Sequence, residues 1–311
     1  MDAFHTQLGT IAIFCKAAEL GSFTAAARAL ALTPAAVSRS VGRLEERLGN
    51  KLFRRTTRSM QLTDDGRLYF EQCRSALAQI DDAQRSITGQ QAQARGLLRI
   101  SVPSTYAHTR LLPRMPAFRA LYPDVELDIN ISTRNIDFVD EGYDVAIRQG
   151  TPPDSRLVAR KLEDASIGVY ASPQYLRARG IPQTLVDLQG THSAQQHTLL
   201  PFVLVSTGRA MPWLFMQGGQ PVELQPHSSV QVSEDPLGAV VLARAGMGLV
   251  QTMGWIASSH PAELTEVLQP FAGRSRPFYV LYPQNKHLAA RVRVLVDFLI
   301  QNQPVAQGNA Q

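Results

Sequence analysis

The sequence has few cysteines and no long apolar run. Its 311 residues include only two cysteines, Cys15 and Cys73, too few for a disulfide-stabilised fold or a four-ligand zinc site. No stretch reaches the roughly 18 uninterrupted apolar residues of a membrane-spanning helix, and the densest, residues 11–18, contains Lys16. Residues 1–10 lack the basic start and apolar run of a secretory signal. We therefore expect a cytoplasmic protein whose two thiols are reduced and buried.

The common catalytic and cofactor motifs are also missing. The sequence contains no Gly-x-Ser-x-Gly elbow, no Walker loop and no His-Glu-x-x-His. Gly246 and Gly248 form only a fragment of a dinucleotide signature, and a helix C-cap explains Gly246 better. His192 and His197 have no third ligand clustered with them, which favours surface or loop histidines over a metal site. We expect no enzyme activity, no metal and no cofactor.

Positive charge is concentrated near the N-terminus. The net charge is +5, and residues 1–95 hold 13 basic and 9 acidic residues, against 18 and 17 in the remainder. At about 150 residues per domain, the length favours two domains. A basic excess confined to a small N-terminal region indicates a module that binds a polyanion, joined to a nearly neutral one.

The N-terminal pattern predicts a helix-turn-helix. Residues 5–18 and 23–30 read as helices, and a third is expected over residues 34–48, with Thr33 as its cap and Pro34 in its first turn. Its apolar stripe consists of Val37, Val41, Leu44 and Leu48, while small and basic side chains project elsewhere. Two short helices separated by a tight turn are typical of DNA-binding heads.

A basic hairpin and a long helix follow. Residues 51–63 predict a β-hairpin crowded with arginines, which after a helix-turn-helix is a wing. Thr63 is expected to cap a helix over residues 64–93. Its near-heptad apolar seam, interrupted by one glutamine, suggests pairing with a second copy; the seam residues are Cys73, Leu77, Ile80, Gln84 and Ile87.

From Gly96 onwards the pattern changes to alternating strands and helices, which favours a doubly wound α/β architecture. The expected strands are residues 97–102, 125–131, 143–148, 167–171, 201–205, 248–253 and 278–282. The expected helices are residues 103–122, 137–141, 173–179, 236–245 and 288–300. Phe202 is assigned to the core.

These segments together resemble the LysR-type transcriptional regulators. In the N-terminal segment the shared elements are Gly21-Ser22-Phe23, an alanine-rich second helix, Ser38, Leu44-Glu45, Leu48-Gly49, Leu52-Phe53, Arg55, Leu62-Thr63 and Gly66. In the rest they are DEGYDVAIRQG (140–150), ARAGMGLVQT (243–252) and RVRVLVDFL (291–299). The resemblance covers residues 4–303, with one departure: Pro34 stands where many members carry a base-reading glutamine.

The resemblance implies α/β architecture with an all-α, winged N-terminal head. The expected domains are a winged helix-turn-helix (1–63), a linker and dimerisation helix (64–93), an effector-binding domain (94–303) and a flexible tail (304–311). The effector-binding domain would consist of two Rossmann-like subdomains, as in periplasmic binding proteins: subdomain I about 94–166 plus 272–303, and subdomain II about 167–271. A homodimer or homotetramer that binds double-stranded promoter DNA and a small organic effector is implied.

Candidate DNA contacts lie on the third helix and the wing. Ser38 offers a short donor, Ala35 allows close approach to a thymine methyl, and arginines pair with guanine or phosphate. We assign base or near-base contact to Ala35, Ser38 and Arg39, and include Arg43. Phosphate or minor-groove contact is assigned to Arg54, Arg55, Thr56 and Arg58. For any single arginine, a solvated surface charge is the alternative.

Candidate effector contacts lie at strand-to-helix turns, where ligands bind in open α/β sheets. They are Ser101, Ser104, Thr105, Tyr106, Arg148, Val205, Asp235 and Pro236. Arg148 is either a counter-charge for an acidic effector or an ion-pair partner of Asp144, and Ser104 and Thr105 are either ligand contacts or plain helix caps. A carboxylate or a phenol is favoured. An α/β enzyme with a nucleic-acid-binding tether is the alternative function, and a constitutive architectural DNA protein is a weaker one.

Overall fold

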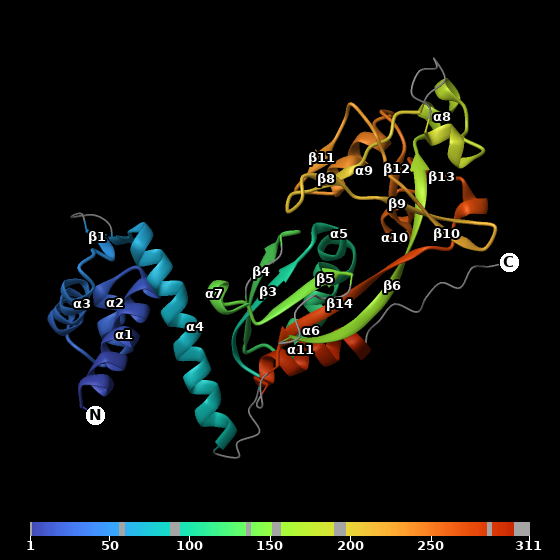
Figure 1. Ribbon diagram of the computed structural model, residues 1–311. Coiled ribbons are helices and arrows are strands. Elements are labelled where there is room, and N and C mark those ends of the chain that lie inside the picture. Colours follow the sequence, from blue (N-terminus) through green and yellow to red (C-terminus); the bar gives the residue numbers. More distant parts are fainter. Residues whose placement is uncertain are drawn as a thin grey trace. The chain divides into compact units, whose positions relative to one another are not determined.

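The computed structural model describes residues 2–55, 60–87, 94–134, 138–150, 157–189, 197–284 and 288–301. The chain divides into two compact units, Met1–Gln93 with Val139–Gly142 and Ala94–Phe138 with Tyr143–Gln311, each of which is described by itself (Figure 1). Within the described residues, no helix is both long and apolar enough to cross a bilayer.

The N-terminal unit has the predicted order of elements. It contains α1 (Asp2–Leu20), α2 (Phe23–Ala29), α3 (Pro34–Leu48), β1 (Phe53–Arg55), β2 (Met60–Leu62) and α4 (Asp64–Ile87). The predicted N-cap of α3 is confirmed, because Thr33 Oγ1 accepts the N–H of Ala36 at 3.2 Å, and Ser22 caps α2 in the same way by accepting the N–H of Ala25 at 3.2 Å. Gly49, at φ 72°, ends α3 in the left-handed conformation that glycine tolerates best.

One aromatic cluster joins these elements. The Phe14 ring is fully buried on α1, with its centroid 5.5 Å from the Phe53 ring of the wing and 5.6 Å from Tyr69 on α4. Both cysteines are buried beside it, and burial raises the pKa of Cys15 to about 12. The helix-turn-helix, the wing and the start of α4 therefore share one core.

The predicted seam of α4 is only partly available to a second copy. Cys73 and Leu77 pack against the core of their own unit, whereas Ile80 is 40% exposed. Leu68, which the predicted seam omits, is 63% exposed. The side chains of Gln84 and Ile87 and the predicted helical residues 88–93 lie outside the described part.

The C-terminal unit is built on a seven-stranded mixed sheet. Strands β3 (Gly96–Val102), β4 (Val125–Ile131) and β5 (Val145–Gln149) are parallel. β14 (Ser275–Pro283) then pairs antiparallel with β5 and with β6 (Leu157–Ala171). β12 (Val250–Met253) and β13 (Thr265–Val267) pair antiparallel with the far end of β6.

Strands β6 and β14 connect the two subdomains (Figure 1). β6 is 15 residues long, and its first part pairs with β14 while Ile167–Ala171 pairs with β12 and β13. The sequence predicted only residues 167–171, because the preceding stretch carries charged side chains such as Lys161 and Asp164, which are half exposed. We refer to the part built on β3, β4 and β5 as subdomain I and to the part around β12 and β13 as subdomain II.

Subdomain I contains a broken helical stretch rather than the predicted continuous one. It consists of α5 (Ser104–Tyr106), the π-helical turn η1 (Ala107–Leu111), the 3₁₀ turn η2 (Leu112–Arg114) and α6 (Met115–Leu121). Pro113 lies in η2 and Pro116 in the first turn of α6, and because neither has an N–H to donate to the preceding turn, the stretch cannot continue as one regular α-helix. α6 packs against α11 (Ala290–Gln301) through the Phe118 and Phe298 rings. The short helix α7 (Phe138–Glu141) precedes β5.

Subdomain II has its own core and two small sheets. Its helical elements are α8 (Pro173–Arg179), η3 (Leu185–Leu188), α9 (Leu237–Arg244), α10 (Gly254–Ser258) and η4 (Gln269–Phe271). Its additional strands are β7 (Phe202–Leu204), β8 (Arg209–Ala210), β9 (Trp213–Gln217), β10 (Gln220–Leu224) and β11 (Val232–Ser233). The β9–β10 hairpin was not predicted, although Gly218 and Gly219, at φ 56° and 76°, form the two-residue turn typical of hairpins.

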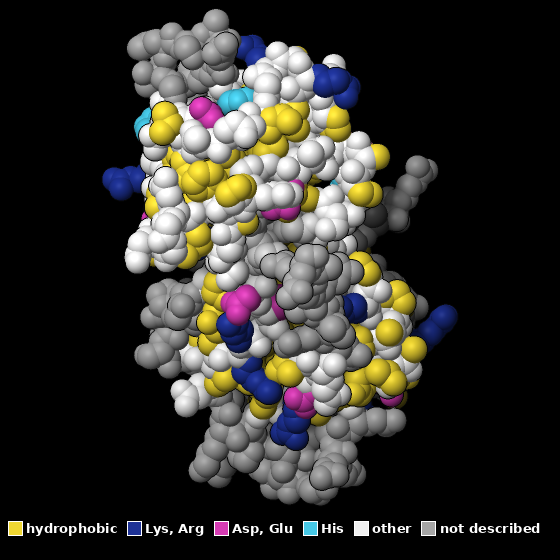
Figure 2. All heavy atoms as spheres, turned by 90° about the vertical axis from the view of Figure 1, so that its right-hand side faces the viewer, with side chains coloured by type: hydrophobic (Ala, Val, Ile, Leu, Met, Phe, Trp, Pro, Cys, Tyr) yellow, Lys and Arg dark blue, Asp and Glu magenta, His cyan; other side chains and the backbone are white. Residues whose placement is uncertain are grey.

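Charge is dispersed on the surface of the C-terminal unit. On the face shown in Figure 2, apolar side chains gather over the upper lobe, and Lys, Arg, Asp and Glu are scattered among them. Exposed apolar residues of subdomain II include Ile181, Val186 and Val205. Among the described residues of this face, positive charge is not concentrated as it would be on a surface that binds a polyanion.

Candidate nucleic-acid interface and ligand cleft

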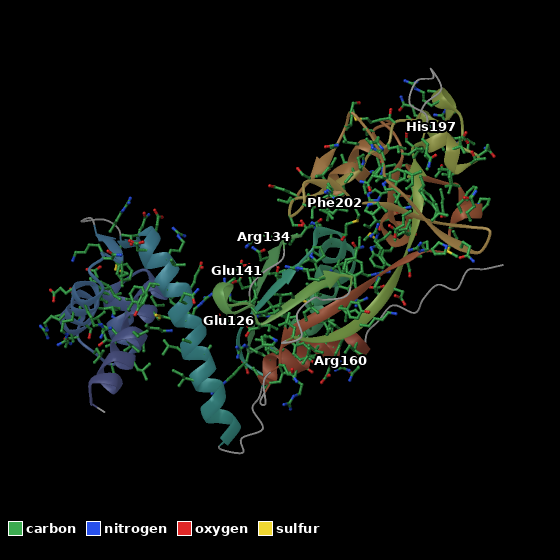
Figure 3. All side chains as sticks on the ribbon, in the orientation of Figure 1. Glu126, Arg134, Glu141, Arg160, His197 and Phe202 are labelled. Atoms are coloured by element: carbon green, nitrogen blue, oxygen red, sulfur yellow. The ribbon has the colours of Figure 1, made fainter. Side chains whose placement is uncertain are left out.

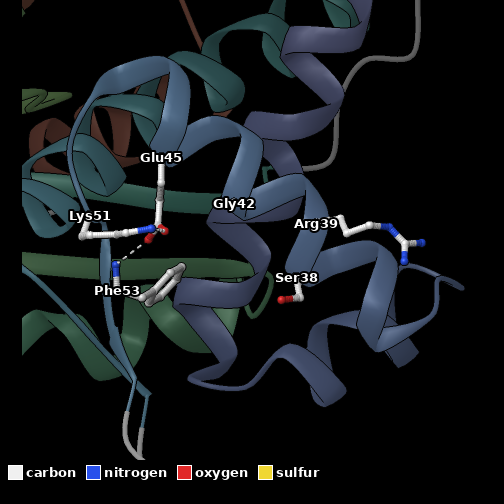
Figure 4. Close-up of a pocket in the computed structure, with 6 residues that line it drawn as sticks. All are labelled: Ser38, Arg39, Gly42, Glu45, Lys51 and Phe53. Atoms are coloured by element: carbon white, nitrogen blue, oxygen red, sulfur yellow. Dashed lines mark hydrogen bonds and ion pairs between the residues drawn. The ribbon is translucent and has the colours of Figure 1, made fainter.

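Helix α3 has one buried face and one exposed face. Val37, Val41 and Leu44 are fully buried, as the apolar stripe predicts, although Leu48 at its end is 40% exposed. Ala35, Arg39 and Arg43 are exposed, and Ser38 is half-buried at the edge between the faces. A shallow hollow beside them is lined by Ser38, Arg39, Gly42, Glu45, Lys51 and Phe53 (Figure 4). The predicted base-contacting residues therefore share one accessible surface.

Glu45 ties α3 to the wing. It is 3% exposed, and its Oε1 accepts the main-chain N–H groups of Leu52 and Phe53 at 3.0 and 3.1 Å. Its Oε2 accepts a hydrogen bond from Lys51 Nζ at 3.0 Å (Figure 4). Burial alone would raise the pKa of Glu45, but these three hydrogen bonds to the carboxylate hold it below its ordinary value.

The other end of the wing is fixed by Thr63 and Gly66. Thr63 Oγ1 donates to the Lys51 carbonyl at 2.6 Å and accepts the N–H of Gly66 at 2.9 Å, which confirms Thr63 as the cap of α4. A Cβ on Gly66 would lie 1.9 Å from the Leu52 carbonyl oxygen. α4 can therefore approach the wing only if this residue is glycine.

The wing residues are partly described. β1 and β2 pair antiparallel from Phe53–Leu62 to Arg55–Met60, as a hairpin requires. Arg54 is exposed on β1, and Arg55 ends that strand. Thr56 and Arg58 lie outside the described residues.

In the C-terminal unit, Arg148 braces three segments of subdomain I. Its guanidinium donates to the carbonyl and hydroxyl of Ser101 at 3.1 and 2.7 Å, and to the carbonyls of Ile147 and Arg134 at 2.7 Å each. Asp144, the acid considered as its partner, accepts a hydrogen bond from Arg291 at 2.9 Å. Ser101 is fully buried.

Two predicted effector residues meet across the subdomains. Ser104 Oγ of subdomain I donates to Asp235 Oδ1 of subdomain II at 2.6 Å. Asp235 Oδ1 also accepts the N–H of Leu237 at 3.0 Å, but the N-cap of α9 is Pro236 and no side chain caps this helix, so Asp235 is not the helix cap that its position before Pro236 favours. Ser104 is not a helix cap, because the capping position is Pro103 and no side chain caps α5.

The remaining predicted effector residues are dispersed. Tyr106 is 1% exposed and packs against the rings of Phe278 and Trp255, so its ring belongs to the core. Burial raises the pKa of its hydroxyl. Thr105 is 5% exposed, whereas Val205 is 65% exposed beyond β7. Phe202, assigned to the core, is only half-buried on β7 (Figure 3).

Sequence reasoning missed several residues that shape these sites. Glu45 follows Val41 by four residues, so a charged residue on the buried side of α3 was a readable signal of an internal partner. Glu234 has φ 64°, and its carbonyl accepts a hydrogen bond from Thr133 Oγ1 at 2.9 Å, which no local pattern announces. His197 lies in a loop, as one of the two alternatives predicted, but it is buried and its Nδ1 is hydrogen-bonded to Tyr175 Oη at 3.3 Å, so the surface alternative was wrong. Gly246, at φ 86°, follows α9 as predicted.

Comparison with known proteins accounts for both units. Residues 8–67 match the family described as "bacterial regulatory helix-turn-helix protein, lysR family", and residues 91–304 match the LysR substrate-binding domain. A transcriptional repressor of Pseudomonas aeruginosa is 33% identical over 297 residues, which cover 95% of this chain and 92% of that protein. The transcriptional activator AaeR of Escherichia coli is 32% identical over 298 residues, which cover 94% and 93%.

Solved structures of LysR-type regulators have the same overall fold. CrgA of Neisseria meningitidis, a LysR-type transcriptional regulator, aligns with a TM-score of 0.60 at 30% identity and covers 96% of this chain and 99% of its own. The full-length Vibrio cholerae virulence activator AphB aligns with a TM-score of 0.58 at 25% identity, covering 96% and 99%. Fold and site define a DNA-binding regulator with a two-subdomain ligand-binding domain. The chain belongs to the LysR family of transcriptional regulators and is not an enzyme.

Proposed function

We propose that the chain recognises a promoter sequence with helix α3 and binds the DNA phosphates with its wing. The base-contacting residues of α3 are Ala35, Ser38, Arg39 and Arg43. The exposed face of α3 carries this proposal, because three of the four residues are exposed while the opposite face is buried. The wing contributes Arg54, Arg55, Thr56 and Arg58. Because its duplex target is chromosomal, we place the protein in the cytoplasm.

The test distinguishes contacts that recognise the base sequence from contacts that depend only on the charge of the DNA. Arg39→Ala should reduce the preference for promoter over unrelated DNA by about 10-fold or more, because one good base contact contributes roughly 1–3 kcal/mol. Arg54→Ala should weaken binding to both DNAs equally and reduce the salt slope by about one. Arg209→Ala, an exposed arginine of subdomain II, is the matched control. Gel shifts across salt concentrations measure all three, and unchanged binding by the first two variants would remove the assignment.

We further propose that a small organic effector binds between the subdomains near Ser101, Ser104, Thr105, Arg148, Val205, Asp235 and Pro236. The contact between Ser104 and Asp235 supports this location, since it brings two predicted residues together. Of a carboxylate and a phenol, the phenol fits better, because its hydroxyl can donate to Asp235 whereas a carboxylate would be repelled. A thermal-shift screen with phenols and small carboxylates tests this choice.

The effector would act by shifting a quaternary equilibrium. We propose a homodimer paired through α4, or a tetramer of two dimers, on an interrupted inverted repeat. The exposed Leu68 and Ile80 support pairing along α4. An effector changes DNA contact only to the extent that it binds the two arrangements with different affinity. Sedimentation of the ligand-free chain measures its oligomeric state.

A further inference from the structure

The two subdomains are joined by more than the strands β6 and β14. Two side-chain hydrogen bonds also join residues of subdomain I directly to residues of subdomain II. Ser104 Oγ donates to Asp235 Oδ1 at 2.6 Å, and Thr133 Oγ1 donates to the Glu234 carbonyl at 2.9 Å. The acceptors are consecutive residues of subdomain II, so both bonds hold the same short segment before α9.

We propose that these two bonds form a latch that keeps the effector domain closed when no effector is bound. The latch, defined as Ser104, Thr133, Glu234 and Asp235, regulates the ligand site of the proposed function and rests on it in that respect. The Ser104 hydroxyl has one proton to donate, so a ligand that accepts a hydrogen bond from it must displace Asp235 as the acceptor. Ligand binding is therefore coupled to release of the latch.

Each side of the latch is held rigidly. On subdomain I, the Arg148 guanidinium donates to the Ser101 hydroxyl and to the Arg134 carbonyl, next to Thr133. Ser104 itself is 5% exposed, so its hydroxyl is fixed in place. Arg148 thus acts as a positioning residue for the latch, because its guanidinium donates to hydroxyl and carbonyl groups of subdomain I.

On subdomain II, the acceptor segment is held in an unusual conformation. Glu234 has φ 64°, a left-handed conformation that is strained for a residue with a Cβ. Asp235 Oδ1 is shared between Ser104 and the Leu237 N–H, which begins α9. Release of the latch allows the backbone of Glu234 to leave this conformation. The closed state therefore holds strain that favours opening when a ligand competes for the Ser104 hydroxyl.

The charge of Asp235 also selects the ligand. The Asp235 carboxylate, which accepts a hydrogen bond from Ser104, repels an anion at this position and can accept a hydrogen bond from a hydroxyl or ammonium group. Ligands that release the latch are therefore hydrogen-bond donors at Asp235. A turn that bound anions would not have this preference for hydrogen-bond donors.

A distance measurement in the ligand-free, full-length chain tests the latch. Spin labels are attached to Leu121→Cys on α6 and Val186→Cys in η3, which are 63% and 72% exposed, and the labelled protein is diluted with unlabelled chains. The native cysteines are buried and stay unlabelled. Ser104→Ala should raise the ratio of open to closed molecules about 10-fold, the effect of losing one hydrogen bond to a charged group. Asp235→Ala should do at least as much.

The double variant tests whether Ser104 and Asp235 act as one hydrogen-bonded pair. Ser104→Ala combined with Asp235→Ala should open the domain no more than Asp235→Ala alone, because Asp235→Ala already removes the acceptor of the Ser104 hydrogen bond. Ser206→Ala and Asp124→Ala, which remove exposed groups from the two subdomains, are the controls. Thr133→Val keeps the side-chain shape and remains informative if Ser104→Ala fails to fold.

Unchanged distances in Ser104→Ala and Thr133→Val, or fully additive effects of Ser104→Ala and Asp235→Ala, would overturn the latch. The measurement uses neither DNA nor effector. A negative result therefore leaves the proposed function intact, and a failure of DNA binding leaves the latch intact.

Discussion

Glu45 of α3 accepts the main-chain N–H of Phe53 in β1 at 3.1 Å, so the helix that carries the predicted base contacts and the wing that carries the predicted phosphate contacts form one rigid element. The same carboxylate oxygen also accepts the Leu52 N–H. A displacement of either element would change the spacing between base and phosphate contacts, on which the register of the protein on DNA depends.

Glu45→Ala should destabilise the N-terminal unit by about 2 to 4 kcal/mol, because two buried main-chain N–H groups and the Lys51 ammonium lose their acceptor. Urea denaturation measures the loss. Glu46→Ala, an exposed neighbour, should change stability by less than about 0.5 kcal/mol. Equal stability of the two variants would show that Glu45 is not the link between helix and wing.

The stability of the N-terminal unit should also depend on Glu45 through pH. Its pKa is lowered from an ordinary value of 4.5, so its ionised form stabilises the fold at neutral pH. This contribution is fully present above pH 4.5 and is lost as pH falls through the lower pKa of the folded state. Unfolding curves from pH 7 to pH 3 should show a fall for the natural chain that is missing in Glu45→Gln. Parallel curves would contradict the assignment.

Gly66→Ala should prevent the N-terminal unit from folding normally. The added Cβ would lie 1.9 Å from the Leu52 carbonyl oxygen, so α4 or the wing must move. Gly9→Ala in α1 is the matched control, because nothing lies within 4 Å of its Cβ position, and it should stabilise the helix by roughly 1 kcal/mol. Thermal unfolding of both variants checks the contrast, and a Gly66→Ala protein as stable as the parent would be inconsistent with this packing.

Arg148→Lys should destabilise the C-terminal unit by about 2 kcal/mol, because an ammonium cannot deliver the planar set of donors that reaches Ser101, Ile147 and Arg134. Arg293→Lys, which changes an exposed arginine on α11, is the control. Calorimetry of the ligand-free chain is the measurement. If Arg148 served only as an effector counter-charge, ligand-free stability would be unaffected.

The sequence predicted those parts of the fold that depend on neighbouring residues. The bounds of α3 follow from Thr33, Pro34 and Gly49, and the structure reproduces them. The sequence could not predict the first part of β6, which carries charged residues because it is only partly covered. Nor could it predict that the Tyr106 ring belongs to the core rather than to the ligand site. Contacts such as that between Ser104 and Asp235, 131 residues apart, arise only from tertiary packing.

Binding to promoter DNA as a function of salt tests the central claim most directly. Fluorescence anisotropy with the purified chain and a fragment from upstream of its own gene should give tight binding in dilute buffer. The logarithm of the affinity should then fall linearly with the logarithm of the salt concentration, as phosphate contacts require. No binding at the lowest salt concentration, with or without phenols and small carboxylates, would contradict the account.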